Sequence, residues 1–333
     1  MNDILRDKLT VIIPTHNREK YLGRSVEYWS SLAVYIIVVD SSSEETKLEF
    51  PANFEYHHLP NESFSKKISY SLSKVKTSYV VMCPDDDFQT ENGLTSCVNF
   101  LEENQNYSAV HGRYISFLKN KEIFIKDIYG SIDKYEVSDI NVLDRLKLGL
   151  ENYILWYWAI HRTEEMKIIF SEYRNVVNGN LIEIGIAIGH LSAGGHKQLP
   201  VFYQAREEIA LSWGRTEPEF SFLACEDSDL EEWRRATIQI IIKLSGMNES
   251  EARAALLLAE NSYTRFLSKR KTPVSKVRAS IKKYLPFVIY EHIVRTYKAI
   301  FKLNPSNGVH QMKYKWWDQS AKKSWQTIFH FIN

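Results

Sequence analysis

Three consecutive aspartates, Asp85, Asp86 and Asp87, follow the apolar run Tyr79–Cys83 and Pro84. Adjacent carboxylates repel one another, so keeping all three ionised costs free energy unless a cation lies among them. Hard divalent ions favour carboxylate oxygens, and Mg²⁺ is commonly held by one or two carboxylates together with substrate phosphates. The cluster therefore indicates a site for a divalent ion and a phosphate-bearing ligand. A solvated acidic turn is the alternative interpretation.

Two more polar loops follow apolar runs earlier in the chain. Pro14-Thr15-His16-Asn17-Arg18 comes after Leu9–Ile13, and Asp40-Ser41-Ser42-Ser43 comes after Tyr35–Val39. If the three runs are parallel strands, their carboxyl ends meet at one edge of the sheet. Ligands of open α/β sheets bind outside that edge. The three loops are therefore expected to form one site.

The elements that must position these loops alternate between strand and helix. Spacing predicts helices over 17–32 and 65–75 and a short strand over 55–59, typical of a mainly parallel sheet covered by helices. Further along, the pattern predicts a helix over 93–102, paired strands over 108–117 and 122–128, and an aromatic strand over 153–161. A helix over 181–191 and a strand over 200–206 follow. From about 217 onward the pattern is helical, with long helices over 226–244 and 249–267.

The length and composition indicate a folded globular protein. The chain has 333 residues, of which 44% are hydrophobic and 25% charged. We expect an α/β domain over 1–216 and a helical region over 217–333. Three widely spaced cysteines suggest a reducing compartment, and no segment resembles a signal peptide or a spanning helix. A cytoplasmic location is therefore expected.

The net charge of +1 conceals an uneven distribution. Between 269 and 333, fourteen Lys and Arg are opposed only by Glu291 and Asp318, a net +12, so the remainder carries −11. This region also interleaves Trp and Tyr with its basic residues, as in Lys313-Tyr314-Lys315-Trp316-Trp317. Such a surface suits an anionic membrane face. A helical cap with a solvated basic face is the alternative, and no nucleic-acid recognition motif is present.

In their order and spacing, the three loops together resemble family 2 glycosyltransferases of the GT-A fold, over about residues 8–210. The resemblance implies that Pro14, Thr15, His16 and Arg18 lie near a nucleotide and that Asp40 contacts its base, although Asp40 could instead form a strand-end Asx turn. It also implies that Asp85 and Asp87, or instead Asp86 and Asp87, hold Mg²⁺ or Mn²⁺, with Asp85 and Asp86 beside the nucleotide. A basic residue in the preceding helix, Lys66 or Lys67, is expected close to the base or phosphate, unless both are solvated.

The resemblance also implies a general base at the start of a later helix. Glu183 fits this position, and Ile184 stands where the family often has aspartate. A helix-terminal glutamate favoured by the helix dipole is the alternative. Glu226-Asp227 is a second acidic pair, but it opens a long helix, where acids are common.

Aromatic side chains before the middle of the chain could line an acceptor site. Trp156, Trp158 and His161 lie in the segment expected near the acceptor, since aromatic faces stack on sugar rings; a core role is the alternative.

The resemblance thus implies metal-dependent, inverting transfer of a sugar from a nucleotide-diphosphate sugar to a saccharide or lipid-linked acceptor, in bacterial surface polysaccharide assembly. The enzyme would be cytoplasmic, with possible peripheral contact at the inner membrane face. The alternatives are a nucleotide-sugar-binding interaction module without turnover and a nucleotidyltransferase. The absence of glycine from 14–18 argues against the nucleotidyltransferase, whereas Pro84 and Ile184 keep the module open.

Overall fold

The computed structural model describes residues 3–119, 123–128, 135–139, 141–154, 156–208, 222, 225–270 and 317–332. Its strands are β1 (Leu9–Thr15), β2 (Tyr35–Asp40), β3 (Phe54–His58), β4 (Tyr79–Met82), β5 (Phe88–Gln89), β6 (Tyr107–Lys119), β7 (Ile123–Ile128), β8 (Glu136–Val137), β9 (Ile160–Arg162) and β10 (Gly195–Glu207). Its helices are α1 (Asp3–Lys8), α2 (Glu19–Ser30), α3 (Phe64–Lys74), α4 (Glu91–Glu103), α5 (Val142–Glu151), α6 (Thr163–Glu172), α7 (Gly179–Ala193), α9 (Asp227–Ser245), α10 (Glu249–Arg270) and α13 (Gln319–Ile332).

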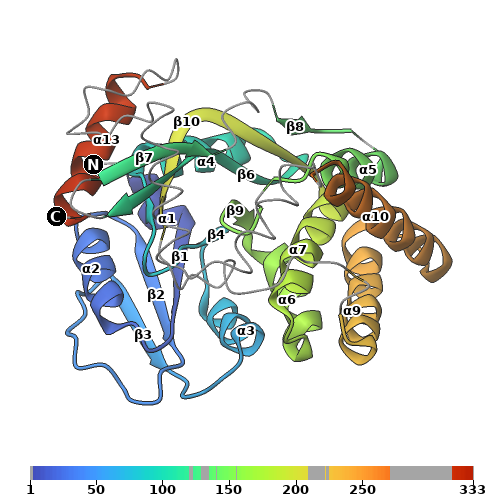
Figure 1. Ribbon diagram of the computed structural model, residues 1–333, viewed down its shortest axis with the longest axis horizontal. Coiled ribbons are helices and arrows are strands. Elements are labelled where there is room, and N and C mark those ends of the chain that lie inside the picture. Colours follow the sequence, from blue (N-terminus) through green and yellow to red (C-terminus); the bar gives the residue numbers. More distant parts are fainter. Residues whose placement is uncertain are drawn as a thin grey trace, which may run out of the picture.

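One mixed sheet runs through the molecule in the order β3-β2-β1-β4-β9-β6-β10-β5 (Figure 1). Strands β3, β2, β1 and β4 are parallel, and β9 joins them antiparallel to the second half, where β6 and β10 are again parallel. This confirms the predicted fold class. The parallel register places Thr15 beside Asp40, so the first two loops leave the same edge.

Helices cover both faces because the central strands are apolar on both sides. In β1, Ile12 packs into one core with α3, α6, α7 and α9, whereas Val11 and Ile13 pack into the other with α2, α4 and α13. The predicted helices and strands of the first 100 residues are confirmed within one to three residues at each end.

Two elements in the middle of the chain differ from the predictions. Residues 153–154 and 156–159 of the aromatic segment are not in a strand: Ala159 N–H donates to Trp156 C=O at 3.0 Å in a turn, and strand β9 begins only at Ile160. Strand β10 begins five residues before the expected Pro200, and a register shift between Gln198 and Phe202 accommodates the proline. The short helices α5 and α6 were not predicted.

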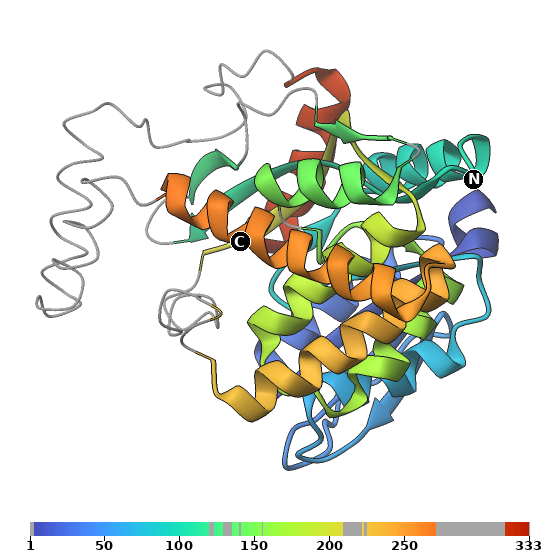
Figure 2. The same cartoon turned by 90° about the vertical axis from the view of Figure 1, so that its right-hand side faces the viewer.

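The helices α9 and α10 pack into the hydrophobic core on one face of the sheet. α10 lies alongside α5, and α9 lies against α7, as Figure 2 shows. Trp233 of α9 belongs to the same buried cluster as Ile12 of β1. The expected boundary near 216, and the basic segment 271–316, lie outside the described residues. In the part of the chain that is described, no helix combines the length and apolarity that crossing a bilayer requires.

Helix α13 returns to the N-terminal side of the sheet. It contacts α2, α4 and β10, and its Trp325, Ile328 and Ile332 are buried there. Trp317 and Trp325, which belong to the basic and aromatic segment noted in the sequence, are therefore core residues. Lys322 and Lys323 remain exposed on the outer face of α13.

Candidate active site

Three loops meet at the carboxyl edge of the parallel strands, as expected from the sequence. β1 ends at Thr15, β2 ends at Asp40, and Cys83 after β4 donates its N–H to the carbonyl of Ile12 in β1 at 2.9 Å. Ser41 N–H donates to the Thr15 carbonyl at 3.1 Å and ties the first two loops together. The residues that carry chemistry are therefore fixed by backbone hydrogen bonds.

Asp85 and Asp86 face the first loop. Thr15 Oγ1 donates to Asp85 Oδ2 at 2.7 Å, and the guanidinium of Arg18 lies 2.9 Å from Asp85 Oδ1 and 2.7 Å from Asp86 Oδ2. Burial raises the pKa of Asp85 to about 6, and the charge of Arg18 opposes this shift. Arg18 thus supplies the positive charge that the acidic cluster requires.

Asp87 faces a different part of the structure. Its carboxylate accepts hydrogen bonds from Gln204 Nε2 at 2.8 Å and from Glu207 N–H at 3.0 Å, and Arg206 Nε lies 3.4 Å away. The loop turns between the acids, since Asp87 N–H donates to the Pro84 carbonyl at 3.1 Å. Burial, then the neighbouring Asp86, raises the pKa of Asp87. Asp87 therefore anchors the acidic loop to β10.

The acidic loop has the carboxylate oxygens that a divalent ion needs, but other groups of the protein already bind these oxygens. Among the described residues, no group of three or more His, Cys, Asp or Glu is placed to hold a metal ion. Asp85 and Asp86 have the hard oxygen donors that Mg²⁺ and Mn²⁺ prefer. These two residues fit such an ion once the guanidinium of Arg18 withdraws, whereas Asp87 is bonded on the side of β10.

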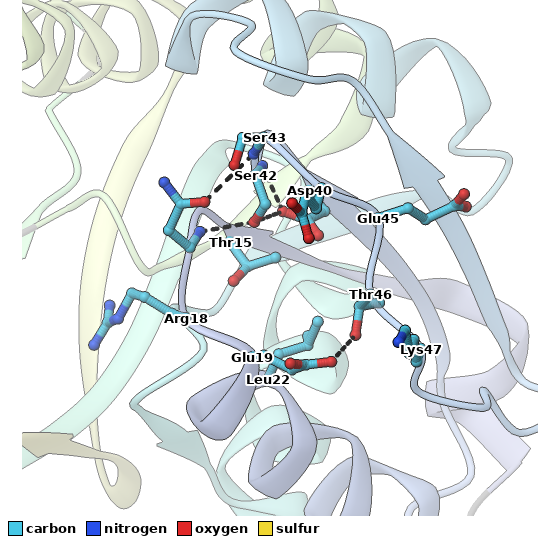
Figure 3. Close-up of a pocket in the computed structure, with 12 residues that line it drawn as sticks. Thr15, Arg18, Glu19, Leu22, Asp40, Ser42, Ser43, Glu45, Thr46 and Lys47 are labelled. Atoms are coloured by element: carbon cyan, nitrogen blue, oxygen red, sulfur yellow. Dashed lines mark hydrogen bonds between the residues drawn. The ribbon is translucent and has the colours of Figure 1, made fainter.

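A cavity of about 440 Å³ lies between the first two loops (Figure 3). Its lining is predominantly polar and comprises Thr15, Asn17, Arg18, Glu19, Leu22, Asp40, Ser42, Ser43, Glu44, Glu45, Thr46 and Lys47. Asn17 has a left-handed backbone (φ 53°), and its N–H donates to Ser42 Oγ at 2.7 Å. Strained backbone of this kind persists where the surrounding contacts hold it.

Asp40 is held within the cavity wall. Its Oδ1 accepts the Ser42 N–H at 2.8 Å, forming an Asx turn, and its Oδ2 accepts the Tyr56 hydroxyl proton at 3.0 Å. Pro14 pairs with Val39 in the sheet, and His16 Nδ1 is 2.9 Å from the Ser41 carbonyl. Asp40 lines the cavity, but its carboxylate also organises the second loop.

The two candidate lysines point in different directions. Lys67 is buried beneath the loops, and its Nζ donates to the Thr15 carbonyl at 2.8 Å and to Ser41 Oγ at 3.0 Å. Burial lowers the pKa of Lys67 to about 8. Lys66 faces solvent and pairs with Glu62 at 3.3 Å. Only Lys67 belongs to the group of charges around the loops.

Glu183 lies near the start of α7 and is partly accessible. The hydroxyl of Tyr153 donates to Glu183 Oε1 at 2.7 Å. Burial raises the pKa of Glu183, while the Tyr153 hydrogen bond and the charge of Arg206 act in the opposite direction. Asn178 caps α7, and Gly194 ends it, where a Cβ would lie 2.8 Å from the Asn106 carbonyl. The second acidic pair, Glu226-Asp227, opens α9 as expected.

Two of the expected acceptor residues are in the core, which corrects that expectation. Trp156 and His161 have no exposed surface; Trp156 packs on His196, and His161 stacks on His190 at 4.1 Å. Neither can touch a sugar in this structure. Trp158 is partly exposed, and its carbonyl accepts the Tyr203 hydroxyl proton at 2.7 Å. Only Trp158 of the three is available to a ligand.

Several charged residues around the acidic loop were not identified from the sequence. Arg24 Nη2 lies 3.2 Å from the Asp86 carbonyl and 2.5 Å from Glu207 Oε2, and Arg206 approaches Asp87. They come from α2 and β10, far from the acidic loop in the chain. Within the sequence, the one feature that could have pointed to them is the position of Arg206 near the end of a predicted strand, where the other site residues also lie.

Comparisons with known proteins find similar glycosyltransferases. Residues 10–170 match the family model described as Glycosyl transferase family 2. This range contains all three loops but ends before Glu183. Glycosyltransferase GlyA of Streptococcus pneumoniae is 25% identical over 222 residues, which cover 63% of this chain and 30% of that protein. This chain therefore spans less than a third of the pneumococcal relative.

A solved structure shares the fold. S. aureus TarS 1–349 in complex with UDP-GlcNAc aligns with a TM-score of 0.50 and 18% identity, covering 78% of this chain and 73% of the TarS chain. The complex of the same TarS fragment with UDP has a TM-score of 0.48 and 17% identity, covering 82% and 78%.

Proposed function

Because residues 10–170 of this chain match the family model described as Glycosyl transferase family 2, we propose that the protein transfers a sugar from a nucleotide-diphosphate sugar to a saccharide or lipid-linked acceptor. The nucleotide would occupy the cavity between the first two loops, with its base toward Asp40 and Ser42. Its diphosphate would extend toward Arg18, where a guanidinium fork matches phosphate oxygens. Lys67 would hold the Thr15 and Ser41 loops in place beneath it.

The proposed reaction is a single displacement with inversion. The acceptor hydroxyl oxygen forms a bond to the anomeric carbon as the bond from that carbon to the diphosphate oxygen breaks, and the hydroxyl proton passes to Glu183. A base works best when its pKa lies near the operating pH, so the raised pKa of Glu183 favours this role. A Mg²⁺ or Mn²⁺ held by Asp85 and Asp86 would supply Lewis-acid stabilisation of the leaving diphosphate.

The observation that carries the proposal is the convergence of charge at one strand edge. Arg18 lines the cavity and pairs with the buried acids, and Lys67 binds the Thr15 and Ser41 loops near Asp85. Glu183 is within the electrostatic reach of Arg206, which also adjoins Asp87. Such an arrangement can neutralise a departing diphosphate while a separate carboxylate takes a proton. A role in surface polysaccharide assembly at the inner membrane face is the further proposal that the basic 269–333 segment supports.

A binding panel followed by a turnover assay tests this function. UDP, GDP, CDP and dTDP are each titrated with Mn²⁺ and with EDTA, starting with UDP because the TarS structure holds UDP-GlcNAc. A saturating nucleotide near 100 Kd should stabilise the fold by about 2.7 kcal/mol. Asp86→Asn is the better test of the acidic loop, because Asp87 also anchors β10. Absence of any nucleotide-dependent shift would refute the donor site.

Ile184 favours one other function, a nucleotide-sugar-binding module without turnover. It stands directly after Glu183, at the position where the family often has an aspartate, so this chain lacks that second carboxylate. The two functions separate in a donor-hydrolysis assay with the cognate nucleotide sugar. Release of nucleotide by the wild type but not by Glu183→Gln, with equal binding by both, supports the enzyme. Equal binding without release by either protein, across the acceptors tried, supports the module.

A further inference from the structure

The guanidinium of Arg18 occupies the carboxylate oxygens that a divalent ion would use. One of its nitrogens lies 2.9 Å from Asp85 Oδ1 and the other lies 2.7 Å from Asp86 Oδ2. The contact with Asp86 is a charge-assisted hydrogen bond, whereas the contact with Asp85 Oδ1 is an ion pair without hydrogen-bond geometry. Both oxygens cannot serve the guanidinium and a metal ion at the same time.

Arg18 is the most exposed of the three ion-paired residues Arg18, Asp85 and Asp86. Its side chain is 30% exposed, whereas Asp85 is 1% and Asp86 10% exposed. Arg18 also lines the cavity between the first two loops, and Figure 3 shows its side chain extending away from Asp40 and Ser42. The guanidinium is therefore the part of this charged group that a ligand in the cavity can reach, while the two acids lie outside the cavity lining.

The side chain of Arg18 can move without unfolding its helix. The Arg18 carbonyl accepts the N–H groups of Tyr21 at 2.9 Å and Leu22 at 3.0 Å, so its backbone is fixed at the start of α2. Beyond that anchor, the charged and ring contacts of the side chain within the described residues are with the two acids and with Tyr21, whose ring centre lies 4.5 Å from the guanidinium carbon. A rotation of the side chain alone would free the acids.

We propose that Arg18 is a displaceable counter-ion: it competes with a divalent cation for Asp85 and Asp86, and the cation binds as the guanidinium withdraws. The withdrawn guanidinium then faces the cavity, where a diphosphate offers it a second anionic partner. The cation and the nucleotide would consequently bind with positive cooperativity, because each stabilises the arrangement that the other requires. This inference rests on the proposed metal-dependent function.

The test measures Mn²⁺ binding to the full chain without nucleotide, by the electron paramagnetic resonance signal of free Mn²⁺. Arg18→Gln should bind Mn²⁺ about tenfold or more tightly than the wild type, since removing one charge-assisted pair removes the competitor. The variant should melt at a lower temperature without metal and regain more stability than the wild type on adding Mn²⁺. Arg18→Lys, which keeps the charge but loses the fork, should bind with intermediate affinity and serves if Arg18→Gln does not fold.

Arg253→Gln is the matched control, because Arg253 pairs with Glu249 on the remote surface of α10. It should leave the Mn²⁺ affinity unchanged. Equal or weaker Mn²⁺ binding by the Arg18 variants would overturn the competition while leaving the metal site intact. If neither the wild type nor any variant binds Mn²⁺, although a nucleotide binds in EDTA, the metal dependence of the proposed function is wrong and the inference falls with it.

Discussion

Replacing the buried His196 by leucine is expected to remove part of the acid sensitivity of the fold. His196 lies at the start of β10, where it packs on Trp156 and lies near Tyr135 and His111. Within the described structure, neither ring nitrogen of His196 has a hydrogen-bond partner. Burial lowers the pKa of His196 well below 6.5, and three neighbouring histidines lower it further. The ring is therefore neutral in the folded protein.

The size of the effect follows from proton linkage. In the unfolded chain His196 titrates near pH 6.5, whereas the buried ring of the folded protein stays unprotonated. At pH 5, proton binding therefore lowers the free energy of the unfolded state by about 2 kcal/mol relative to the folded state. At pH 7.5 this term is close to zero. The stability contributed by neutral burial is thus lost as the pH falls through 6.5. The free energy of unfolding of the wild type should drop by about 2 kcal/mol relative to His196→Leu between pH 7.5 and pH 5.

The measurement is urea unfolding of both proteins at pH 7.5, 6 and 5. The comparison between two proteins cancels most contributions from other groups, including Glu165, whose pKa burial raises to about 7 and which acts in the opposite direction. His330→Gln, at an exposed position of α13, is the control for replacing a histidine outside the buried cluster. A difference between wild type and His196→Leu that stays constant from pH 7.5 to 5 would refute the reasoning.

Three further changes test the site and the packing. Glu183→Gln keeps a partner for the Tyr153 hydroxyl but removes the base, so turnover should fall about 10²–10⁴-fold in a steady-state assay, with nucleotide affinity unchanged; an unchanged rate would assign the proton transfer elsewhere. Lys67→Met removes the two hydrogen bonds from Lys67 Nζ to the first two loops and should weaken nucleotide binding about tenfold by calorimetry; equal affinity would contradict a binding role. Trp325→Ala should lower the free energy of unfolding by about 3 kcal/mol in urea; a loss under 1 kcal/mol would show that α13 contributes little.

The elements around the site could be predicted because their signals are local. Buried parallel strands are short apolar runs, and each ends in a polar loop, so β1, β2 and β4 and their shared edge follow from the sequence alone. Thr15, Arg18 and Lys67, which were expected near the nucleotide, lie around this edge. Their contacts with a nucleotide remain a proposal.

What the sequence could not indicate were directions and distant partners. Asp85 and Asp87 are equivalent in a run of three acids, and only the turn after Pro84 sends one toward Thr15 and the other toward β10. The pairing of Arg24 with Glu207 joins residues 183 positions apart, which no local pattern encodes. A tryptophan in an aromatic segment looks the same in the sequence whether it stacks on a sugar or fills a core. In the structure Trp156 is buried in the core.

The return of α13 to the first half of the sheet has a consequence for how the chain is made. Its apolar face rests on α2, which leaves the ribosome about 290 residues earlier. At 5–20 residues per second, that surface stays uncovered for roughly 15–60 s of synthesis. During this interval the face of the sheet that Trp325 later covers is open to chaperones or to other nascent chains. The emergence of α13, rather than completion of the sheet, therefore sets when this face of the sheet becomes covered.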